Sequence, residues 1–493
     1  MFSLLLLSAC SAVIDGEDGE AMPEAGNYYV NFAIAVNNGT NITRAGEVPT
    51  GGENGDGREA GFERENAISG ITIILYQDAN GINTTADPTL DFVRYYSVTL
   101  GGRDAQGTTY TDKTSEAYYT TGNQPLGTHS LDFTKTYHAI VIANAPQVAA
   151  SLTEGTSKLS DIRNGTLSSV YLGSAMQSAA SCTNFVMSSE TDNTINFSSV
   201  TGTNLDGSTH TKGQDMLYNL ESQPLVIERM AARIDFWSKN SNGYKTSADN
   251  AAYTTPGYEY DVTGTSDKFV VTGIVPFNLV NGHADYGNEY LIKRLTDDLA
   301  NASTTTKYLQ DETATSYVLD PKTLEKGSSA NPNLTNPLAN VYGGIASLES
   351  NSYYHSIADM HASEAKLTIS DKENVVVAYP MENTLIPDSK LYYHATGVAL
   401  IGYYYYGGTG TGERYVYLGY LRHQGTESSY DISPSTTPYA TTDAMGAAKA
   451  MQYSVVRNNI YRISINSIDS KGNITLRIVV KKWDPFTHAT IYM

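Results

Sequence analysis

Short runs of alternating residues recur along the chain and limit what it can fold into. In the first run, Val30, Phe32, Ile34 and Val36 occupy every second position of a stretch that ends at Asn37. A period of two places such side chains on one face of a half-buried β-strand. Further strands are predicted at 71–76, 92–100, 137–143, 185–187, 195–197, 225–237, 269–280, 374–379, 398–406, 415–421, 459–468 and 474–483.

The fold class follows from the spacing of these strands and from the composition. The 493 residues include 37 tyrosines and only 17% charged residues, which is typical of a protein rich in strands and turns. Frequent strands without alternating helices favour packed sheets over βαβ units. We predict an all-β protein made of β-sandwich domains, with short helical insertions at 290–300, 352–365 and 444–454.

A break at Glu221–Pro224 divides the chain and leads into the apolar stretch LVIERMAARIDFW. The strand period holds at both ends of this stretch and slips in the middle, which predicts a bulge. We take the stretch as the start of a second domain, so that the N-terminal domain spans 45–223 and the C-terminal domain spans 224–493. In the strand at 269–280, Pro276 is expected to interrupt the ladder because proline lacks an N–H group.

The first ten residues, MFSLLLLSAC, have features of a lipoprotein export signal. Their apolar run is too short to span a membrane, and Leu7–Cys10 resembles the lipobox, in which the cysteine becomes the lipidated first residue. The usual basic segment is missing, so 1–10 is expected to be a truncated signal peptide. Residues 11–27 are acidic and contain glycine, which suits a flexible tether between a lipid on Cys10 and the fold.

Arg44 follows the first strand and precedes about twenty residues with little apolar content. Loops of small and polar residues are preferred sites of proteolysis, so a trypsin-like protease is expected to reach the bond between Arg44 and Ala45. A cut there would detach the tether and first strand, 11–44. Arg58 and Arg64 are alternative cleavage points. An ordinary first strand followed by an ordinary loop arginine stays open as the alternative.

A second extended segment ends the chain. After Asp484-Pro485 the sequence FTHATIYM forms a tail at about 484–493. Loss of the first strand would expose an apolar groove and unpaired backbone groups, and the tail of a neighbouring copy can fill them. Such a head-to-tail contact does not close, so it builds a filament. The residues assigned to this donor strand are Phe486, His488, Thr490, Ile491 and Tyr492.

Several separated segments together resemble the fimbrillins of Bacteroidetes, the FimA/Mfa-type subunits of type V pili. The resemblance covers nearly the whole chain and depends on the order and spacing of its parts. These parts are Leu7–Cys10, Val30–Val36 with Asn41–Ala45, Ile140–Asn144, Asn184–Ser188, Ile227–Phe236, Tyr379–Thr384, Val456–Tyr461 and Val479–Trp483.

The resemblance implies two transthyretin-like β-sandwich domains, export as an outer-membrane lipoprotein and cleavage by an arginine-specific protease at Arg44. It also implies a fimbrium on the cell surface with a role in adhesion, in which the partners are neighbouring copies, tip subunits and anchor subunits. An anchor subunit would lack the cleavable arginine, and a tip subunit would lack the donor strand. This chain has both, so the resemblance favours a polymerising shaft subunit, with a tip or anchor subunit as the alternative.

Signatures of enzymes are missing from the sequence, which contains no Gly-x-Ser-x-Gly elbow, P-loop or His-Glu-x-x-His motif. Gly407–Gly412 lies between two tyrosine-rich strands without a following helix, so it predicts a hairpin turn rather than a dinucleotide loop. His355 and His361 lie near acidic residues, and solvated surface side chains are favoured over a metal site. We therefore expect no catalysis, cofactor or metal.

The net charge of −20, without a run of Lys and Arg, argues against nucleic acid or an anionic membrane as a partner. A monomeric surface glycan-binding lipoprotein is the alternative from another class, because such proteins also carry lipoboxes, acidic tethers and aromatic β-sandwiches. They display tryptophan platforms for sugars, whereas Trp237 and Trp483 both fall in apolar strand patterns that predict burial.

Overall fold

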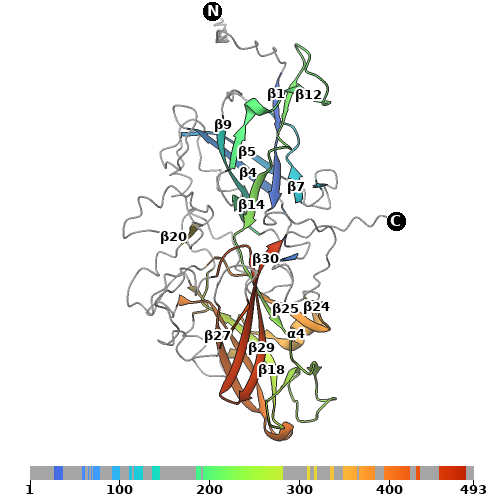
Figure 1. Ribbon diagram of the computed structural model, residues 1–493, viewed down its shortest axis with the longest axis vertical. Helices are drawn as coiled ribbons and strands as arrows, with labels where there is room; N and C mark the ends of the chain where they lie inside the picture. Colours follow the sequence, from blue (N-terminus) through green and yellow to red (C-terminus); the bar gives the residue numbers. More distant parts are fainter. Residues whose placement is uncertain are drawn as a thin grey trace, which may run out of the picture.

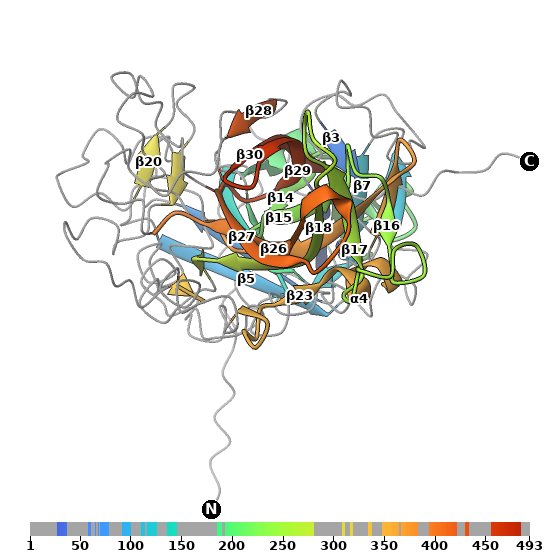
Figure 2. The same ribbon diagram turned by 90° about the horizontal axis from the view of Figure 1, so that it is seen from below.

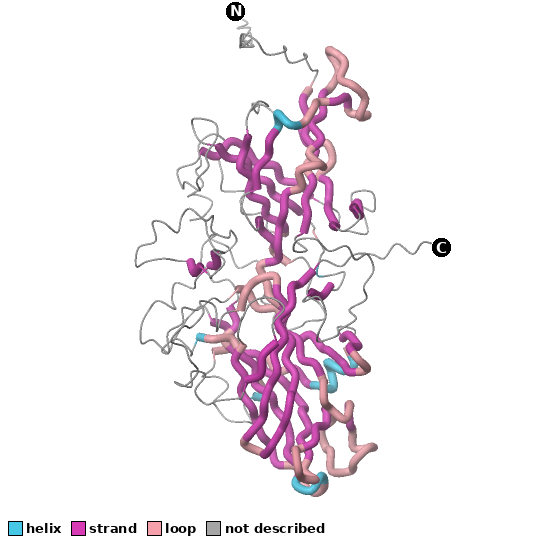
Figure 3. The backbone as a smooth tube through the Cα atoms, viewed as in Figure 1, coloured by secondary structure: helices cyan, strands magenta, loops and turns pink. Residues whose placement is uncertain are grey.

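The computed structural model is an elongated molecule with two β-rich halves along its longest axis (Figure 1). Strands dominate both halves, and helices are short (Figure 3), so the predicted all-β fold is confirmed. The described residues are 27–36, 58–60, 65, 68, 70–77, 91–99, 110–113, 116–125, 136–144, 185–189, 193–280, 308–310, 316–318, 334–337, 348–363, 366–382, 394–421, 429–432 and 455–484.

The N-terminal half contains two sheets within the described residues. A four-stranded sheet has the order β12 (Thr203–Asn204), β13 (Met216–Asn219), β1 (Tyr28–Asn31) and β8 (Gln124–Pro125). A nine-stranded sheet has the order β5 (Asp91–Thr99), β4 (Gly70–Gln77), β9 (Thr136–Ala143), β10 (Met187–Ser189), β14 (Leu225–Arg229), β2 (Ala33–Val36), β7 (Glu116–Thr120) and β6 (Tyr110–Lys113), with β11 (Asn193–Asn196) paired to β9.

The C-terminal half contains two larger sheets in the part of the chain that is described. One has seven strands: β24 (Lys366–Ile369), β25 (Lys372–Ala378), β15 (Arg233–Trp237), β29 (Asn459–Ser470), β30 (Asn473–Asp484) and β28 (Ser429–Ile432), with β3 (Arg58–Ala60) on β30. The other has six: β16 (Tyr244–Lys245), β17 (Gly257–Asp261), β18 (Lys268–Phe277), β26 (Gly397–Tyr405) and β27 (Glu413–Tyr420), with β23 (His355–Ser356) on β18.

Shorter elements complete the described structure. β19 (Leu279–Val280) pairs with β22 (Leu334–Thr335), and β20 (Tyr308–Gln310) pairs with β21 (Ser316–Val318). The helix α4 (Ile357–Ala362) lies inside the predicted helical range 352–365, and two 3-10 turns span Phe197–Ser199 and Tyr406–Gly408. The predicted helices at 290–300 and 444–454 lie outside the described residues.

The core of the C-terminal half lies between its two sheets. Seen along the long axis, β29 and β15 face β18 and β26 across the core (Figure 2). Phe236 of β15 and Tyr258 of β17 meet there, with 6.2 Å between their ring centroids. Ile463 of β29 and Leu400 of β26 belong to the same buried cluster, so the two sheets form a β-sandwich.

One continuous segment, 225–237, joins the two halves. Its first part is β14, which pairs with β10 and β2 in the N-terminal sheet, and its second part is β15, in the C-terminal sheet. The strand breaks at Met230–Ala232, where the hydrophobic pattern predicts a slip. Ala232 N donates to the carbonyl of Pro380 at 2.8 Å, so the chain stays hydrogen-bonded while it changes sheets.

Two local predictions, one of a hairpin turn and one of a strand interruption, have opposite outcomes. The hairpin at Gly407–Gly412 is confirmed, because β26 and β27 pair antiparallel on either side of it. The interruption expected at Pro276 is wrong: β18 runs through this residue, which lies opposite Val398 in the ladder. The proline carbonyl still accepts a hydrogen bond from Asn336 Nδ2 at 2.7 Å, and the strand ends instead at Phe277, before Asn278 with its φ of 52°.

The enclosed Nε2 of His355 predicts that the stability of this half depends on pH. Its Nε2 is enclosed and has no hydrogen-bond partner among the described residues, and burial lowers its pKa from 6.5 to about 4. The unfolded chain therefore takes up a proton at a higher pH than the folded chain. This contribution to stability is lost progressively as the pH falls from about 6.5 toward 4.

We expect His355→Gln to remove this dependence. Between pH 7 and pH 5, the variant should lose about 2 kcal/mol less of its unfolding free energy than the wild-type chain does. Denaturant unfolding of both chains at the two pH values measures the difference. Equal losses in the two chains would show that His355 does not titrate as its burial indicates.

Candidate functional site around the first strand

The strand at 28–36 is paired along both of its edges. β1 pairs in parallel with β13 and antiparallel with β8, and β2 pairs in parallel with β14 and antiparallel with β7. The segment 216–227 therefore flanks one edge and the segment 118–125 flanks the other. The strand lies inside its sheets, so its departure would expose two rows of backbone groups.

The strand passes from one sheet to the other at Phe32 without losing its hydrogen bonds. Phe32 N donates to Thr121 Oγ1, and Thr121 N donates to the carbonyl of Phe32, both at 3.0 Å. At the start of the strand, the backbone N and Nδ2 of Asn27 donate to Asp215 Oδ1 at 2.9 and 3.0 Å. β1 and β2 thus behave as a single strand shared by two sheets.

Side chains on both faces of this strand are buried. Val30, Phe32 and Ile34 are 0% exposed and join the main core, as their period-two spacing predicts. Ala33 and Asn31, on the opposite face, are also buried, so the expectation of a half-buried strand is wrong here. Ala33 packs on Val226, and Asn31 Nδ2 donates to Asn219 Oδ1 at 3.3 Å. The backbone of Val36 pairs with Ile227, and its side chain lies outside the described residues.

The burial of this strand is large compared with the stability of a domain. Full burial of an aliphatic or aromatic side chain stabilises by about 1.5–3 kcal/mol, so three such residues contribute about 5–9 kcal/mol. A whole domain is stable by about 5–15 kcal/mol. The groove that holds Val30, Phe32 and Ile34 therefore has to be occupied if the N-terminal half is to stay folded.

The other predicted site residues lie outside the described part of the chain. These are Cys10, Arg44, Ala45, Phe486, His488, Thr490, Ile491 and Tyr492. Their roles stay predictions. Of the two alternative cleavage points, Arg58 is described and lies in β3, whereas Arg64 is not described.

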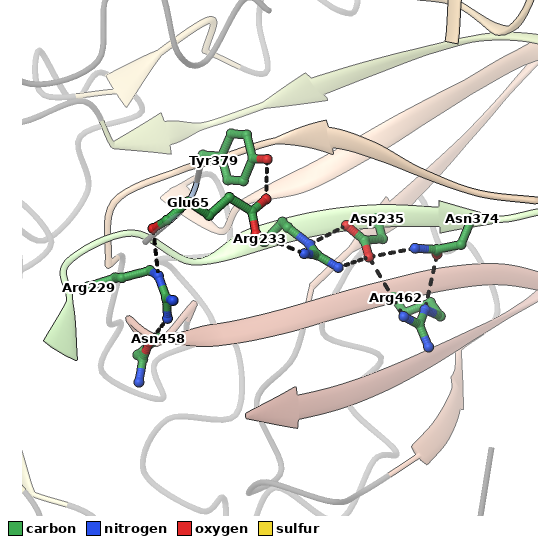
Figure 4. Close-up of polar contacts among 8 residues, drawn as sticks. All are labelled: Glu65, Arg229, Arg233, Asp235, Asn374, Tyr379, Asn458 and Arg462. Carbon is green, nitrogen blue, oxygen red and sulfur yellow. Dashed lines mark hydrogen bonds and ion pairs between the residues drawn. The ribbon is translucent and has the colours of Figure 1, made fainter. Parts of the chain in front are cut away.

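A buried polar network that the sequence pattern did not reveal lies where the two halves meet (Figure 4). Arg233 makes two hydrogen bonds of 2.9 Å to Asp235 and an ion pair of 3.2 Å with Glu65, and all three side chains are fully buried. Asp235 also accepts from Asn374 Nδ2 at 2.8 Å. Charged residues inside the apolar stretch 225–237 were the available signal, because a strand that buries both faces must pair any charge it carries.

A second buried arginine joins the two halves directly. Arg457, just before β29, donates through Nε to Glu382 at 3.1 Å and through Nη1 to Ser188 Oγ at 3.3 Å. Ser188 belongs to β10 of the N-terminal sheet. Bonds of this kind fix the orientation of one half against the other, because a guanidinium offers donors in set directions.

His361, His355 and the side chain of Trp237 all lie among residues of the fold. His361 Nδ1 lies 2.7 Å from Glu373, and its ring stacks on Tyr244 with 3.9 Å between centroids. His355 is half-buried, with its Nε2 atom enclosed. Trp237 is 3% exposed, as predicted, and donates to the carbonyl of Ile369.

Neither a metal site nor a membrane helix is found in the described ranges. Their His, Cys, Asp and Glu side chains do not gather in any group of three or more that could hold a metal ion. None of their helices is long and apolar enough to cross a bilayer.

Comparisons with known proteins place the chain beside solved structures of low similarity. No protein-family model and no curated protein matches it. A proposed cell adhesion protein from Parabacteroides distasonis has 10% identity and a TM-score of 0.43, over 94% of this chain and 99% of that one. The tip fimbrial protein Mfa3 from Porphyromonas gingivalis has 11% identity and a TM-score of 0.39, over 93% and 100%.

A fimbrilin from Porphyromonas gingivalis W83 has 12% identity and a TM-score of 0.37, over 94% of this chain and 99% of that one. TM-scores below 0.5 at such identities do not establish a shared function. The functional conclusion therefore depends on the strand geometry and on the sequence motifs.

The buried face of the first strand yields a stability prediction. Phe32→Ala in the full-length chain should lower the unfolding free energy of the N-terminal half by about 3–5 kcal/mol, because it leaves a cavity in the main core. Thr194→Ala, at an exposed position of β11, is the control and should change it by less than about 0.5 kcal/mol. Denaturant unfolding measures both. A loss below about 1 kcal/mol for Phe32→Ala would mean that the strand does not hold the core together.

Proposed function

We propose that this chain is a structural subunit of a bacterial surface fimbrium that polymerises by donor-strand exchange. The supporting observation is the position of the strand at 28–36: it is the first described strand, and it lies inside its sheets with Val30, Phe32 and Ile34 buried. A cut between this strand and β3 would leave it held by noncovalent contacts alone. The groove would then be open to another strand of similar pattern.

The proposed sequence of events starts with a lipoprotein precursor. Lipid on Cys10 holds the precursor at the outer membrane through the tether, and an arginine-specific protease cuts between Arg44 and Ala45. The first strand leaves, and the tail at 484–493 of a neighbouring copy takes its place, with Phe486 and its neighbours in the groove. Tip and anchor subunits of the same fimbrium are the further partners, and the role of the filament is adhesion rather than catalysis.

Two alternative functions, a glycan-binding lipoprotein and a tip or anchor subunit, fit the observations less well. A glycan-binding lipoprotein would need an exposed tryptophan platform, and the described tryptophan side chain, that of Trp237, is buried. A tip or anchor subunit would lack either the donor tail or the cleavable arginine, whereas this sequence has Arg44 and the tail at 484–493 that are proposed for these roles. A polymerising shaft subunit is the function that fits these observations best.

Replacement of the cleavable arginine tests the proposal. Arg44→Ala should give a folded chain that stays monomeric after treatment with a trypsin-like protease, whereas the wild-type chain should form SDS-resistant ladders. Arg58→Ala and Arg64→Ala are matched controls and should assemble like the wild type. N-terminal sequencing of the assembled form should begin at Ala45. Normal ladders from Arg44→Ala would place the cleavage elsewhere or overturn the proposal.

Removal of the tail tests the other partner of the exchange. A chain that lacks residues 486–493 should fold and be cut after Arg44, but it should not extend a filament because it has nothing to insert. Mixed with the processed wild-type chain, it should shorten the ladders in proportion to its share. Electron microscopy and denaturing gels measure this. Filaments of normal length from the truncated chain alone would rule out the donor role.

A further inference from the structure

The chain just after the proposed cleavage site is fastened to the C-terminal half at two places. At the first, β3 pairs in parallel with the end of β30, so that Arg58 lies opposite Lys482 and Ala60 lies opposite Asp484. At the second, Glu65 is fully buried where the two halves meet. Chain order places both in the range 45–223, but β3 pairs with a strand of the C-terminal half, and Glu65 bonds to Arg233 and Tyr379 of that half as well as to Arg229 of β14. We call β3 together with Glu65 the latch.

The first part of the latch holds the last residues of β30. The pairing of β29 with β30 reaches Lys482, opposite Asn459, and goes no further. Lys482 therefore uses one edge for β29 and the other for β3. Trp483 and Asp484 pair only with β3 among the described residues. Asp484 is also the residue at which the predicted donor strand begins, so β3 pairs with the residue that leads into that strand.

The second part of the latch is a buried carboxylate with specific partners (Figure 4). Glu65 Oε2 lies 3.2 Å from Arg233 Nη1, and its Oε1 accepts a hydrogen bond from the hydroxyl of Tyr379. The Glu65 carbonyl accepts from Arg229 Nε at 3.1 Å. Removing one member of a buried ion pair is strongly destabilising, because the other charge is left without compensation. Glu65 is thus held firmly in place.

Glu65 also lies close to the flank of the first strand. Arg229, which binds the Glu65 carbonyl, is in β14 and follows Ile227 by two positions. Ile227 pairs with Val36, the last residue of β2. The same strand therefore supports the segment that leaves and the segment that stays.

We propose that the latch remains on the subunit after processing, confines cleavage to the Arg44–Ala45 bond and orients the start of the donor strand. This inference rests on the proposed function. A protease requires locally released chain around the bond that it cuts. A cut after Arg58 requires β3 to leave its ladder, and a cut after Arg64 requires the buried Glu65 to enter the protease. A cut after Arg44 requires neither.

Protease mapping on the full-length folded chain tests the first consequence. A trypsin-like protease should cut after Arg44 at least about tenfold faster than after Arg58 or Arg64 in the wild-type chain. In the double variant Ala60→Pro/Glu65→Gln, cutting after Arg58 and Arg64 should rise at least about tenfold, with the Arg44 rate unchanged. Mass spectrometry of the early fragments measures the rates.

Two further variants make this test decisive. Asp371 is an exposed acid in the turn between β24 and β25. The variant Asp371→Asn is the control, and the protease should cut it at the same rates as the wild type. Tyr379→Phe removes only the hydroxyl that binds Glu65, so it should accelerate the cut after Arg64 but not after Arg58, and it serves if the double variant does not fold. Equal rates at the three arginines in the wild type, or no change in the variants, would overturn the latch.

Hydrogen exchange tests the second consequence without any assembly. Backbone amides at 482–484 should be protected in the wild type and should exchange at least about tenfold faster in Ala60→Pro/Glu65→Gln, while those at 476–478 stay unchanged. Unaltered protection at 482–484 would show that β3 does not hold the end of β30. Because neither experiment depends on filaments, a wild-type chain that is cut after Arg44 but forms no ladders would contradict the proposed function and not the latch.

Discussion

The N-terminal half depends on a strand that is paired on both edges and buried on both faces. In the order β12-β13-β1-β8, β1 alone connects β13 with β8, and in the larger sheet β2 stands between β14 and β7. Departure of the strand at 28–36 would therefore divide both sheets at once within the described residues. The fragments would include a ribbon of two short strands, and such ribbons are marginally stable in water by themselves. A groove of this kind has only two stable conditions, filled by its own strand or filled by another one.

Local patterns in the sequence predicted the strands well, and long-range pairing explains what they missed. The apolar runs at 71–76 and 137–143 and the alternating run at 474–483 are found as β4, β9 and β30, because local apolar patterns report how a single strand meets the core. Alternation correctly predicted which side chains of the first strand face the core. It did not predict that the opposite face is also buried, because that burial depends on partners about 190 residues away, such as Asn219. It also could not place Glu65 beside Arg229, since these residues are 164 positions apart. The interruption at Pro276 was wrongly predicted. A missing N–H breaks a ladder only where it would face a paired strand, and the sequence does not reveal which edge of a strand is paired at that residue.

Buried charges connect the two halves and limit how they can be arranged. The segment 225–237 passes from one sheet to the other, and Arg229 and Arg233 lie on either side of the switch at Met230–Ala232. Buried ion pairs add little net stability compared with a well-packed apolar core, but they accept few alternative geometries. Arg233 needs both Asp235 and Glu65 in place, and Arg457 needs Glu382 as well as Ser188 from the other half. The network therefore selects one relative orientation of the halves rather than supplying most of their stability.

The two sides of Arg44 are bound by different kinds of interaction, and this difference accounts for their proposed fates. Val30, Phe32 and Ile34 are held by apolar burial and by ladder bonds, which depend on a period-two pattern and on no particular partner. Any extended segment with a similar pattern can supply these apolar and ladder contacts, although not the side-chain bonds of Asn27 and Asn31 to Asp215 and Asn219, so the first strand is largely replaceable in physical terms. Glu65 is held by Arg233 and Tyr379, whose donors require a carboxylate at that point. A strand that binds through generic contacts can be exchanged between copies of the chain, whereas a segment that binds through a buried charge stays with its own subunit.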